Sequence, residues 1–370
     1  MSEGDQMPEA VTECMAHADD PAAWFAQDFD GNDEWLYRFT HADLNELTRA
    51  AAHSARVPLP ELQADDFPLD GLAVTLAGLR REILQGRGFV LLRGLPVSKW
   101  SPALTARIYY GMGCHMGQAV SQNASGHLLG HVKDLGKDPS DPVTRVYQTN
   151  YRQPFHTDST DIVGLLCIKT ARRGGASAIA SSTSAFNVLA EQRPDLLEVL
   201  CQPFYVDRKD EIPPGKEPTY QLAVFHRHAG YVTCIYARDF IEAAQRFDDV
   251  PRLLPEQIEA MDFLDKLVAS DRLRFDMVFE PGDIQLLHNH QILHSRTTYE
   301  DWPEIEHRRH LLRLWLSTAD GRPLPMAFEE RYGTITPGMI RGGIRVSGAV
   351  LNAPIEPYTS GPIHHYESLR

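Results

Sequence analysis

Hydrophobic positions recur at two different periods along this chain, and the period changes near residue 144. In the first half, residues 71–85 carry apolar side chains at helical spacing and are followed by Gly86 and Gly88, which end helices readily. The expected elements of this half are a helix at 71–85, a buried strand at 89–92, a helix at 102–111 and a turn at Gly111 and Gly113.

From residue 144 onward, short β-rich runs replace the helical pattern. Two helices interrupt these runs, at 184–200 and at 254–269, and Pro255 falls in the first turn of the second. Many short strands with few helices predict a mainly β fold, a barrel or sandwich with flanking helices, rather than a doubly wound parallel sheet. The expected strands are 144–149, 163–169, 176–181, 203–208, 221–226, 230–236, 273–279, 283–288, 292–298 and 310–317.

The two ends of the chain depart from this pattern. Residues 1–70 are acidic and Pro-rich near their end, and we expect them to form an irregular or helical N-terminal extension packed on or beside the core. One elaborated domain is expected over 71–340, followed by a C-terminal tail over 341–370. A chain of 370 residues is long enough to bury a large core in this way.

Charge and cysteine usage narrow the class of partners. The formal net charge of −14 argues against non-specific binding to nucleic acid or to an anionic membrane. No run approaches 18 apolar residues and the N-terminus is acidic, so we expect a cytoplasmic protein without a signal peptide or membrane span. Five scattered cysteines without C-x-x-C spacing disfavour disulfides and zinc fingers. The expected partners are small molecules, and formation of a homo-oligomer is left open.

His156 and Asp158 are two residues apart and are candidate metal ligands. In an extended strand both point to one side while Thr157 points away, so both can reach one ion. The preceding Pro154 and Phe155 favour a strand that opens at this motif, on the edge of a sheet. Two nitrogens and one carboxylate oxygen with open positions suit non-haem Fe(II) that activates O2. The spacing alone is a weak signal, because the chain has 16 His and 50 acidic residues.

Three histidines compete for the place of the third ligand. His288, His290 and His294 would all project from one face of an unbroken strand over 286–296, so the pattern alone does not choose among them. A break near Asn289 weakens that argument, and His294 lies in the better strand.

Arginines surround the last strong strand, 310–317. Arg309 and Arg313 are four residues apart and share one face of an extended strand, opposite a row of leucines. A charge inside an apolar strand is costly unless it is paired, so each arginine needs an anion. That anion is either an Asp or Glu of the protein or the carboxylate of a small molecule, which a guanidinium binds in bidentate fashion.

Five motifs occur in a fixed order and together resemble a known family. The family is the taurine dioxygenase (TauD/TfdA) and clavaminate synthase-like group of Fe(II)/2-oxoglutarate oxygenases, and the resemblance covers roughly residues 75–318. The motifs are Gly88-Phe89-x3-Arg93-Gly94-Leu95, Phe155-His156-Thr157-Asp158, Gly174-Gly175-x-Ser177, Asn289-His290-x3-His294-x-Arg296 and His307-Arg308-Arg309-x3-Arg313.

The resemblance implies a double-stranded β-helix core, of the jelly-roll or cupin-like type, with iron held by His156, Asp158 and His294. It implies that Arg309 receives the distal carboxylate of 2-oxoglutarate and that the hydroxyl of Ser177 supports it. The family's usual Gly-Gly-Asp-Thr reads Gly-Gly-Ala-Ser here, so Ser177 departs from the pattern.

The implied cofactors and co-substrates are Fe(II), 2-oxoglutarate and O2. 2-Oxoglutarate is converted to succinate and CO2 while a substrate C–H bond is oxidised, with hydroxylation favoured over halogenation because Asp158 fills the position where halogenating relatives admit chloride. Arg313 matches an arginine that meets an anionic substrate group in several relatives, so its role and that of Arg309 could be exchanged. We expect a small carboxylate-bearing substrate received by Arg313, with Arg208 as a second candidate, beneath a polar lid at 209–220.

Two other classes of function stay open from the residues alone. A non-catalytic β-barrel binding protein would have incidental His and Asp residues, and its arginines would be in salt bridges. A zinc hydrolase using the same three ligands is less favoured, since no Glu occurs at H-E-x-x-H spacing.

Overall fold

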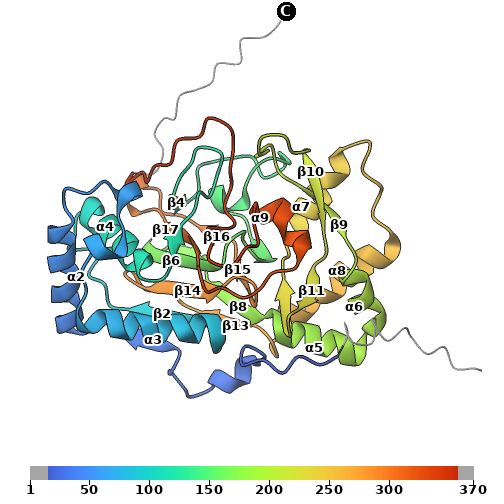
Figure 1. Ribbon diagram of the computed structural model, residues 1–370, viewed down its shortest axis with the longest axis horizontal. Coiled ribbons are helices and arrows are strands. Elements are labelled where there is room, and N and C mark those ends of the chain that lie inside the picture. Colours follow the sequence, from blue (N-terminus) through green and yellow to red (C-terminus); the bar gives the residue numbers. More distant parts are fainter. Residues whose placement is uncertain (1–15, 357–370) are drawn as a thin grey trace, which may run out of the picture.

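The computed structural model describes residues 16–356, and two β-sheets packed together form its centre (Figure 1). The larger sheet contains, in spatial order, β1 (Leu36–Arg38), β2 (Phe89–Arg93), β14 (Ile284–His288), β6 (Ile162–Lys169), β17 (His310–Ser317) and β3 (Gln118–Ala119), with β4 (Leu129–Val132) also paired to β17. The smaller sheet contains β13 (Phe275–Met277), β8 (Ser177–Ser181), β15 (Ile292–Arg296) and β5 (Gln153–His156).

Helices and three two-stranded sheets surround the two large sheets (Figure 1). The paired short strands are β7 (Arg173–Gly174) with β16 (Tyr299–Glu300), β9 (Phe204–Asp207) with β10 (Thr219–Leu222), and β11 (Phe225–His228) with β12 (Tyr231–Cys234). The helices are α2 (His41–His53), α3 (Gly71–Gln85), α4 (Pro102–Cys114), α5 (Ser182–Gln192), α6 (Pro194–Leu200), α7 (Arg238–Ala243), α8 (Pro255–Val268) and α9 (Glu329–Tyr332).

The hydrophobic core lies on both faces of the larger sheet, because successive side chains along each strand point to opposite faces. Val163 and Leu165 of β6 join a buried cluster with Ile179 of β8 and Ile292 of β15, between the sheets. Leu166, next along β6, joins the opposite cluster, under the helices. Both faces of this sheet are therefore covered, which matches its nearly continuous apolar strands.

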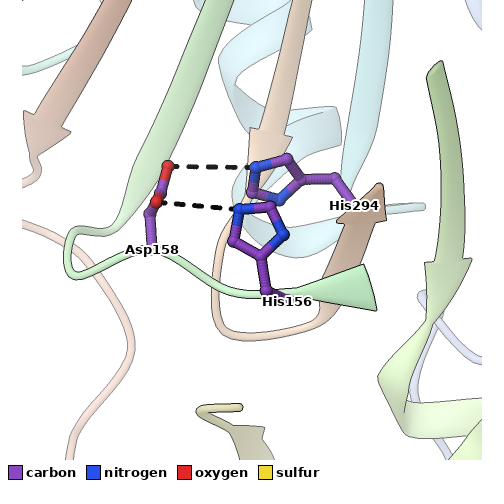
Figure 2. Close-up of side chains that lie close together, drawn as sticks. All are labelled: His156, Asp158 and His294. Atoms are coloured by element: carbon purple, nitrogen blue, oxygen red, sulfur yellow. Dashed lines mark ion pairs between the residues drawn. The ribbon is translucent and has the colours of Figure 1, made fainter. Parts of the chain in front are cut away.

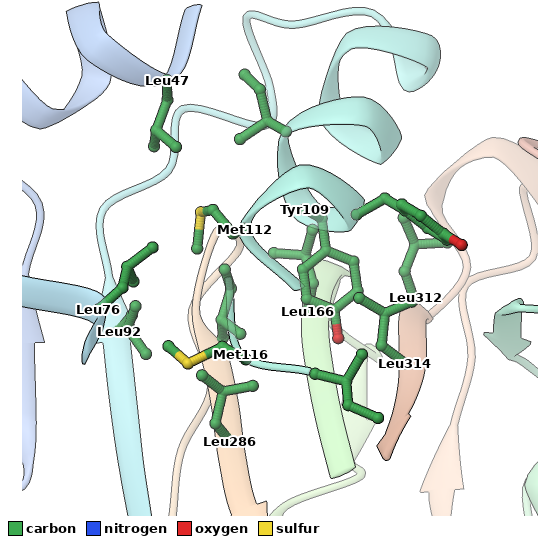
Figure 3. Packing of buried hydrophobic residues seen from close by; sticks show 14 of the residues in the cluster. Leu47, Leu76, Leu92, Tyr109, Met112, Met116, Leu166, Leu286, Leu312 and Leu314 are labelled. Atoms are coloured by element: carbon green, nitrogen blue, oxygen red, sulfur yellow. The ribbon is translucent and has the colours of Figure 1, made fainter. Parts of the chain in front are cut away.

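Helices α2, α3 and α4 cover the outer face of the larger sheet (Figure 3). Leu47 of α2, Leu76 of α3 and Met112 of α4 pack with Leu166 and Leu314. On the other side of the molecule, α5, α6 and α8 share a separate cluster with β11 and β12. The expectation of a mainly β core with flanking helices is confirmed.

Several expected elements are found where the apolar pattern placed them, including the helix at 71–85 and the strand at 310–317. The turn expected at Gly111 and Gly113 is wrong, because both residues lie inside α4. A Cβ at Gly111 would lie 2.4 Å from the Phe67 ring, so the glycine serves close packing of the helix rather than a turn.

Three other expectations are corrected. Residues 144–149 form a loop with a short 3-10 helix over Val146–Gln148 instead of a strand. The helix expected at 184–200 is two helices, because Arg193 precedes Pro194 and takes φ −144°, which the steric demand of a following proline favours. The strand expected at 221–226 is divided between β10 and β11.

Both ends of the described chain pack on the core. Trp24 is buried between the sheets, β1 pairs in parallel with β2, and Arg341 and Ile344 are buried near the other end. Residues 1–15 and 357–370 lie outside the described part, so the division into extension, domain and tail stays a prediction. Among the described helices, none has the length and apolar character needed to cross a membrane.

Candidate active site

His156, Asp158 and His294 meet at the open edge of the smaller sheet (Figure 2). Antiparallel pairing of β15 with β5 sets His294 directly opposite His156. The Nε2 atom of His156 lies 4.0 Å from one carboxylate oxygen of Asp158, and the Nε2 atom of His294 lies 3.8 Å from the other. One ligand atom from each residue falls within 4.8 Å of the others, so a single ion can contact all three.

The local backbone differs from the expected strand. His156 is the last residue of β5, and Asp158 follows in irregular chain, so the expectation that the motif opens a strand is wrong. Thr157 does point away, since its backbone N–H donates to the Tyr236 carbonyl at 2.7 Å and its hydroxyl accepts from the Tyr236 N–H at 2.9 Å. The two ligands thus share a side although only one is in a strand.

The protonation states suit a divalent cation. Burial lowers the pKa of His294 to about 3, which leaves a neutral imidazole with a free lone pair. Burial by itself would raise the pKa of Asp158, but the positive charge of Arg313, the electrostatic interaction with the neighbouring histidines and a hydrogen bond from Trp315 lower it to about 2. Two imidazole nitrogens and an ionised carboxylate are a donor set that fits Fe(II).

Two residues from distant parts of the chain hold Asp158 in place. The Trp315 indole Nε1 donates to Oδ2 of Asp158 at 2.8 Å. The Asn289 side chain accepts from the Asp158 N–H at 2.7 Å and donates to its carbonyl at 2.8 Å. Such supporting contacts orient ligands and tune the affinity of a metal site.

The other two candidate histidines face elsewhere. The chain turns at Asn289, between β14 and β15, as the break predicted there requires. His290 Nε2 lies 3.0 Å from Oδ1 of Asp161, and His288 Nδ1 lies near the Gln291 side chain. Neither takes part in the cluster of Figure 2.

A cavity beside the metal ligands, here called the Arg309 cavity, contains the expected co-substrate residues. Arg309 is only 4% exposed, its Nη1 makes no hydrogen bond, and no described carboxylate pairs with it. A Cβ at Gly175 would lie 3.0 Å from Nε of Arg309, so the Gly-Gly motif makes room for this arginine. The cavity lining includes His156, Ser177, His294, Arg296, Arg309 and Arg313.

Arg313 is paired inside the protein, in contrast to Arg309. Its Nη1 lies 3.4 Å from Oδ2 of Asp158, and its Nε donates to the Gln122 side chain at 2.7 Å. Its guanidinium also lies over the Tyr147 and Trp315 rings, each at 4.7 Å. The sequence left open whether each arginine pairs with a carboxylate of the protein or with a small molecule. Of the two, Arg313 has the partner within the protein.

Arg208 lines neither of the cavities beside the ligands, although its guanidinium lies 4.6 Å from the ring centre of Tyr220, which lines the larger one. It donates from Nε to the Glu217 carbonyl at 3.0 Å and pairs through Nη2 with Glu330. The role of Arg208 in binding substrate stays a prediction. To bind a substrate anion, Arg208 would first have to break its ion pair with Glu330.

A second, larger cavity, here called the Arg331 cavity, adjoins the other side of the ligands. The residues lining this cavity include His156, Asp158, Arg313 and Trp315. The apolar part of its wall includes Val206, Leu222, Val224, Ile235, Phe240 and Ile241. Further polar side chains of its lining are Arg145, Tyr220, Arg238, Asp239 and Arg331. Arg313 therefore borders both cavities.

Several residues of the site carry no role in the sequence-based expectations. Trp315 is two residues from Arg313 in β17, so strand periodicity could have placed both on one face. Asn289 and Arg296 belong to the family motifs, but the sequence assigned them no role. Gln122 and Arg331 give no local signal at all.

Two packed sheets with two imidazoles and a carboxylate at their edge define the class: a cupin-like protein with three candidate ligands for a single metal ion. The chain belongs to the TauD/TfdA family, since the model described as "Taurine catabolism dioxygenase TauD, TfdA family" matches residues 55–315. It is an Fe(II)- and 2-oxoglutarate-dependent dioxygenase, which uses O2 and releases succinate and CO2.

Three relatives show the extent of the similarity. FR-33289 synthase of Streptomyces rubellomurinus is 30% identical over 323 residues, covering 84% of this chain and 94% of the relative. Taurine hydroxylase-like protein SAT17 of Stachybotrys chartarum is 29% identical over 308 residues, covering 80% and 78%. Uridine-5'-phosphate dioxygenase of Amycolatopsis sp is 28% identical over 197 residues, covering 49% and 66%.

Solved structures share the fold at lower identity. Asparagine oxygenase in complex with Fe(II), 2S,3S-3-hydroxyasparagine and succinate has a TM-score of 0.59 at 18% identity, covering 77% of this chain and 94% of its own. The non-haem iron oxygenase OrfP in complex with Fe and alpha-ketoglutaric acid has a TM-score of 0.56 at 16% identity, covering 76% and 94%. The expected cupin-like fold is thereby confirmed.

Proposed function

We propose that this dioxygenase hydroxylates a C–H bond of a small carboxylate-bearing molecule, with iron held by His156, Asp158 and His294. The observation that carries the proposal is the convergence of these three ligands between two cavities, one of which contains the unpaired Arg309. One cavity then serves the co-substrate and the other the molecule that is oxidised.

Arg309 is the proposed anchor for the distal carboxylate of 2-oxoglutarate. A buried guanidinium without a carboxylate partner is costly, and a carboxylate entering the cavity removes that cost. Ser177, buried at the start of β8 and lining the same cavity, is proposed to donate its hydroxyl to the same carboxylate. Since Arg313 already pairs with Asp158, the assignment of the two arginines favours Arg309.

Bound Fe(II) with 2-oxoglutarate supplies the activation of O2. The chain's own residues orient the parts: Trp315 and Asn289 hold Asp158, and the antiparallel pair β5 and β15 holds the two histidines. The apolar wall of the Arg331 cavity excludes water from the reacting face and receives the body of the substrate.

An anionic substrate is favoured by the charges near the site. Arg313 borders the Arg331 cavity, so its positive charge adds to that of the other arginines that line it. The name of the Amycolatopsis relative specifies a phosphate-bearing molecule, which supports an anionic class. Arg208 is kept as a secondary candidate only.

Succinate release tests the proposal most directly. Anaerobic addition of Fe(II) and 2-oxoglutarate to the protein is expected to give a weak visible charge-transfer band, and aerobic turnover is expected to rise with small carboxylic acids. If the band forms but only neutral compounds, and no acids, stimulate succinate release, the proposal of an anionic substrate would be contradicted. Absence of the band in the unaltered protein would contradict the metal assignment itself.

A further inference from the structure

The Arg331 cavity contains more positive charge than its own acidic groups neutralise. Four arginines line it: Arg145, Arg238, Arg313 and Arg331. Charged side chains near the surface of a cavity are ordinarily neutralised by neighbours, so the pairing of each arginine shows which of them is available to a ligand.

Three of the four arginines are already engaged. Arg145 pairs with Glu211 and stacks over Phe240 at 5.0 Å. Arg238 contacts three carboxylates at 2.7 to 2.9 Å. Arg313 pairs with Asp158.

Arg331 has no such partner among the described residues. It is half-buried on α9, and its hydrogen bond is from Nη1 to the Gly343 carbonyl at 3.2 Å. The adjacent Glu330 does not neutralise it, because Glu330 pairs with Arg208 and Lys216. Arg331 therefore lines the cavity with most of the donors of its guanidinium unused by the described residues.

The position of Arg331 is set by its neighbours on α9. Tyr332 is 1% exposed and packs with Phe328 and Leu222, and Leu222 also lines the cavity. The hydrogen bond to Gly343 adds a second constraint. A charged group on a packed support binds a ligand with less loss of conformational freedom than one on a free loop.

The acidic side chains of the cavity are all in use. Asp158 belongs to the metal ligands, and Asp239 pairs with Lys209 at 3.1 Å. Within the described lining, no free carboxylate is left to receive the ammonium group of an amino acid. The cavity thus offers a free cation and a largely apolar wall, but no free anion.

We propose that Arg331 determines substrate specificity by binding an oxyanion group, namely a carboxylate, sulfonate or phosphonate, of an acid whose body is apolar and carries no ammonium group. This proposal rests on the proposed function for the identity of the cavity, and it names a receiver other than Arg313 and Arg208. The apolar body lies along the wall that includes Leu222 and Phe240, with the anion at Arg331.

Calorimetric titration of the metal-free protein tests the proposal without turnover. The probes are hexanoate, hexanesulfonate and hexylphosphonate, with methyl hexanoate as the neutral probe and 6-aminohexanoate as the amine-bearing one. R331Q is expected to weaken binding of the anion that binds most tightly by about tenfold or more, and binding of methyl hexanoate is expected to stay unchanged. R331K is expected to restore part of the anion affinity.

The matched control is R345Q, because Arg345 is exposed and outside the cavity lining. R345Q is expected to bind every probe like the unaltered protein. The proposal would be overturned if R331Q bound the anions as tightly as the unaltered protein does, or if R331Q lost affinity for the anions and for methyl hexanoate to the same extent. It would also be overturned if the unaltered protein bound 6-aminohexanoate more tightly than hexanoate, or if it bound none of the anions. The three anions distinguish which oxyanion the site prefers.

A parallel assay separates this proposal from the proposed function. Succinate release with the preferred anion is expected to show a raised KM for that anion in R331Q and an unchanged KM for 2-oxoglutarate. If iron-dependent succinate release is absent while the anion still binds through Arg331, the proposed function fails and the anion site stands. If succinate release is normal and R331Q has no effect on either measurement, the anion site fails alone.

Discussion

The Arg309 cavity and the Arg331 cavity share the metal ligands but are built from different parts of the fold. Ser177, His294 and Arg313, in strands of the two packed sheets, line the Arg309 cavity. The outer wall of the Arg331 cavity comes from the hairpin β9–β10, helix α7 and the short helix α9, outside those sheets. The proposed co-substrate side is thus part of the core, whereas the proposed substrate side is made of segments that connect the core strands, and such segments can vary without disturbing the core.

Each cavity also contains an arginine without a carboxylate partner among the described residues, Arg309 in one and Arg331 in the other. The Arg309 cavity contains a second such arginine, Arg296, which donates to the backbone carbonyls of Thr149 and Tyr151. Arg309 is almost fully buried, and burial lowers its pKa, whereas Arg331 is half-buried. A single anion of defined length suits the first, and ligands of varied size suit the second. Variants on the two sides should therefore affect different kinetic constants.

Loss of a metal ligand should abolish activity altogether, so that the separate kinetic effects of the two cavities can no longer be measured. His294→Ala removes a nitrogen ligand, so iron binding, the anaerobic charge-transfer band and succinate release are all expected to fall below detection. Metal analysis and visible spectroscopy measure this, with the exposed His228→Ala as control. Retention of stoichiometric iron by His294→Ala would contradict the ligand assignment.

Arg309→Gln should affect the co-substrate side alone. The KM for 2-oxoglutarate is expected to rise about ten- to hundredfold, because hydrogen bonds to a charged partner are worth about 1.5–3 kcal/mol. Arg308→Gln is the matched control, since that neighbour bonds only loop carbonyls. A change in the Kd for substrate with an unchanged KM for 2-oxoglutarate would instead assign the anchor to Arg313.

Trp315→Phe should weaken the metal centre without removing a ligand. The indole hydrogen bond to Asp158 is lost, and iron affinity is expected to fall about tenfold, the lower end of what supporting residues contribute. Competition with a chelator measures the affinity, and the exposed Trp302→Phe should leave it unchanged. An unaltered affinity would mean that Arg313 and Asn289 suffice to hold the carboxylate.

Ile241→Val should have the smallest effect, limited to the substrate side. One buried methylene is removed from the wall of the Arg331 cavity, so the KM for substrate is expected to change by about fourfold or less. The free energy of unfolding is expected to fall by about 1 kcal/mol, as chemical denaturation would show. The KM for 2-oxoglutarate should not move, and the exposed Ile258→Val serves as control.

The order of helices and strands was largely predictable from the apolar pattern. The helix at 71–85 and the strands around 163–169 and 310–317 are strongly periodic, and each was found close to its expected bounds. The failures are short or interrupted segments. In the loop at 144–149, for example, Arg145 pairs with Glu211, which is 66 positions away in the chain. The local apolar pattern contains no information about such a contact.

The sequence by itself determined which residue types could bind a metal and an anion, because the His-x-Asp spacing and the arginines of the last strand are local features. Tertiary structure alone decided which of three histidines faces Asp158 and which arginines lack an internal partner. His294 stands opposite His156 only because β15 pairs with β5, while His290 lies beside Asp161. Arg313 pairs with Asp158, and Arg309 and Arg331 do not, because charge pairing depends on distances between residues far apart in the chain.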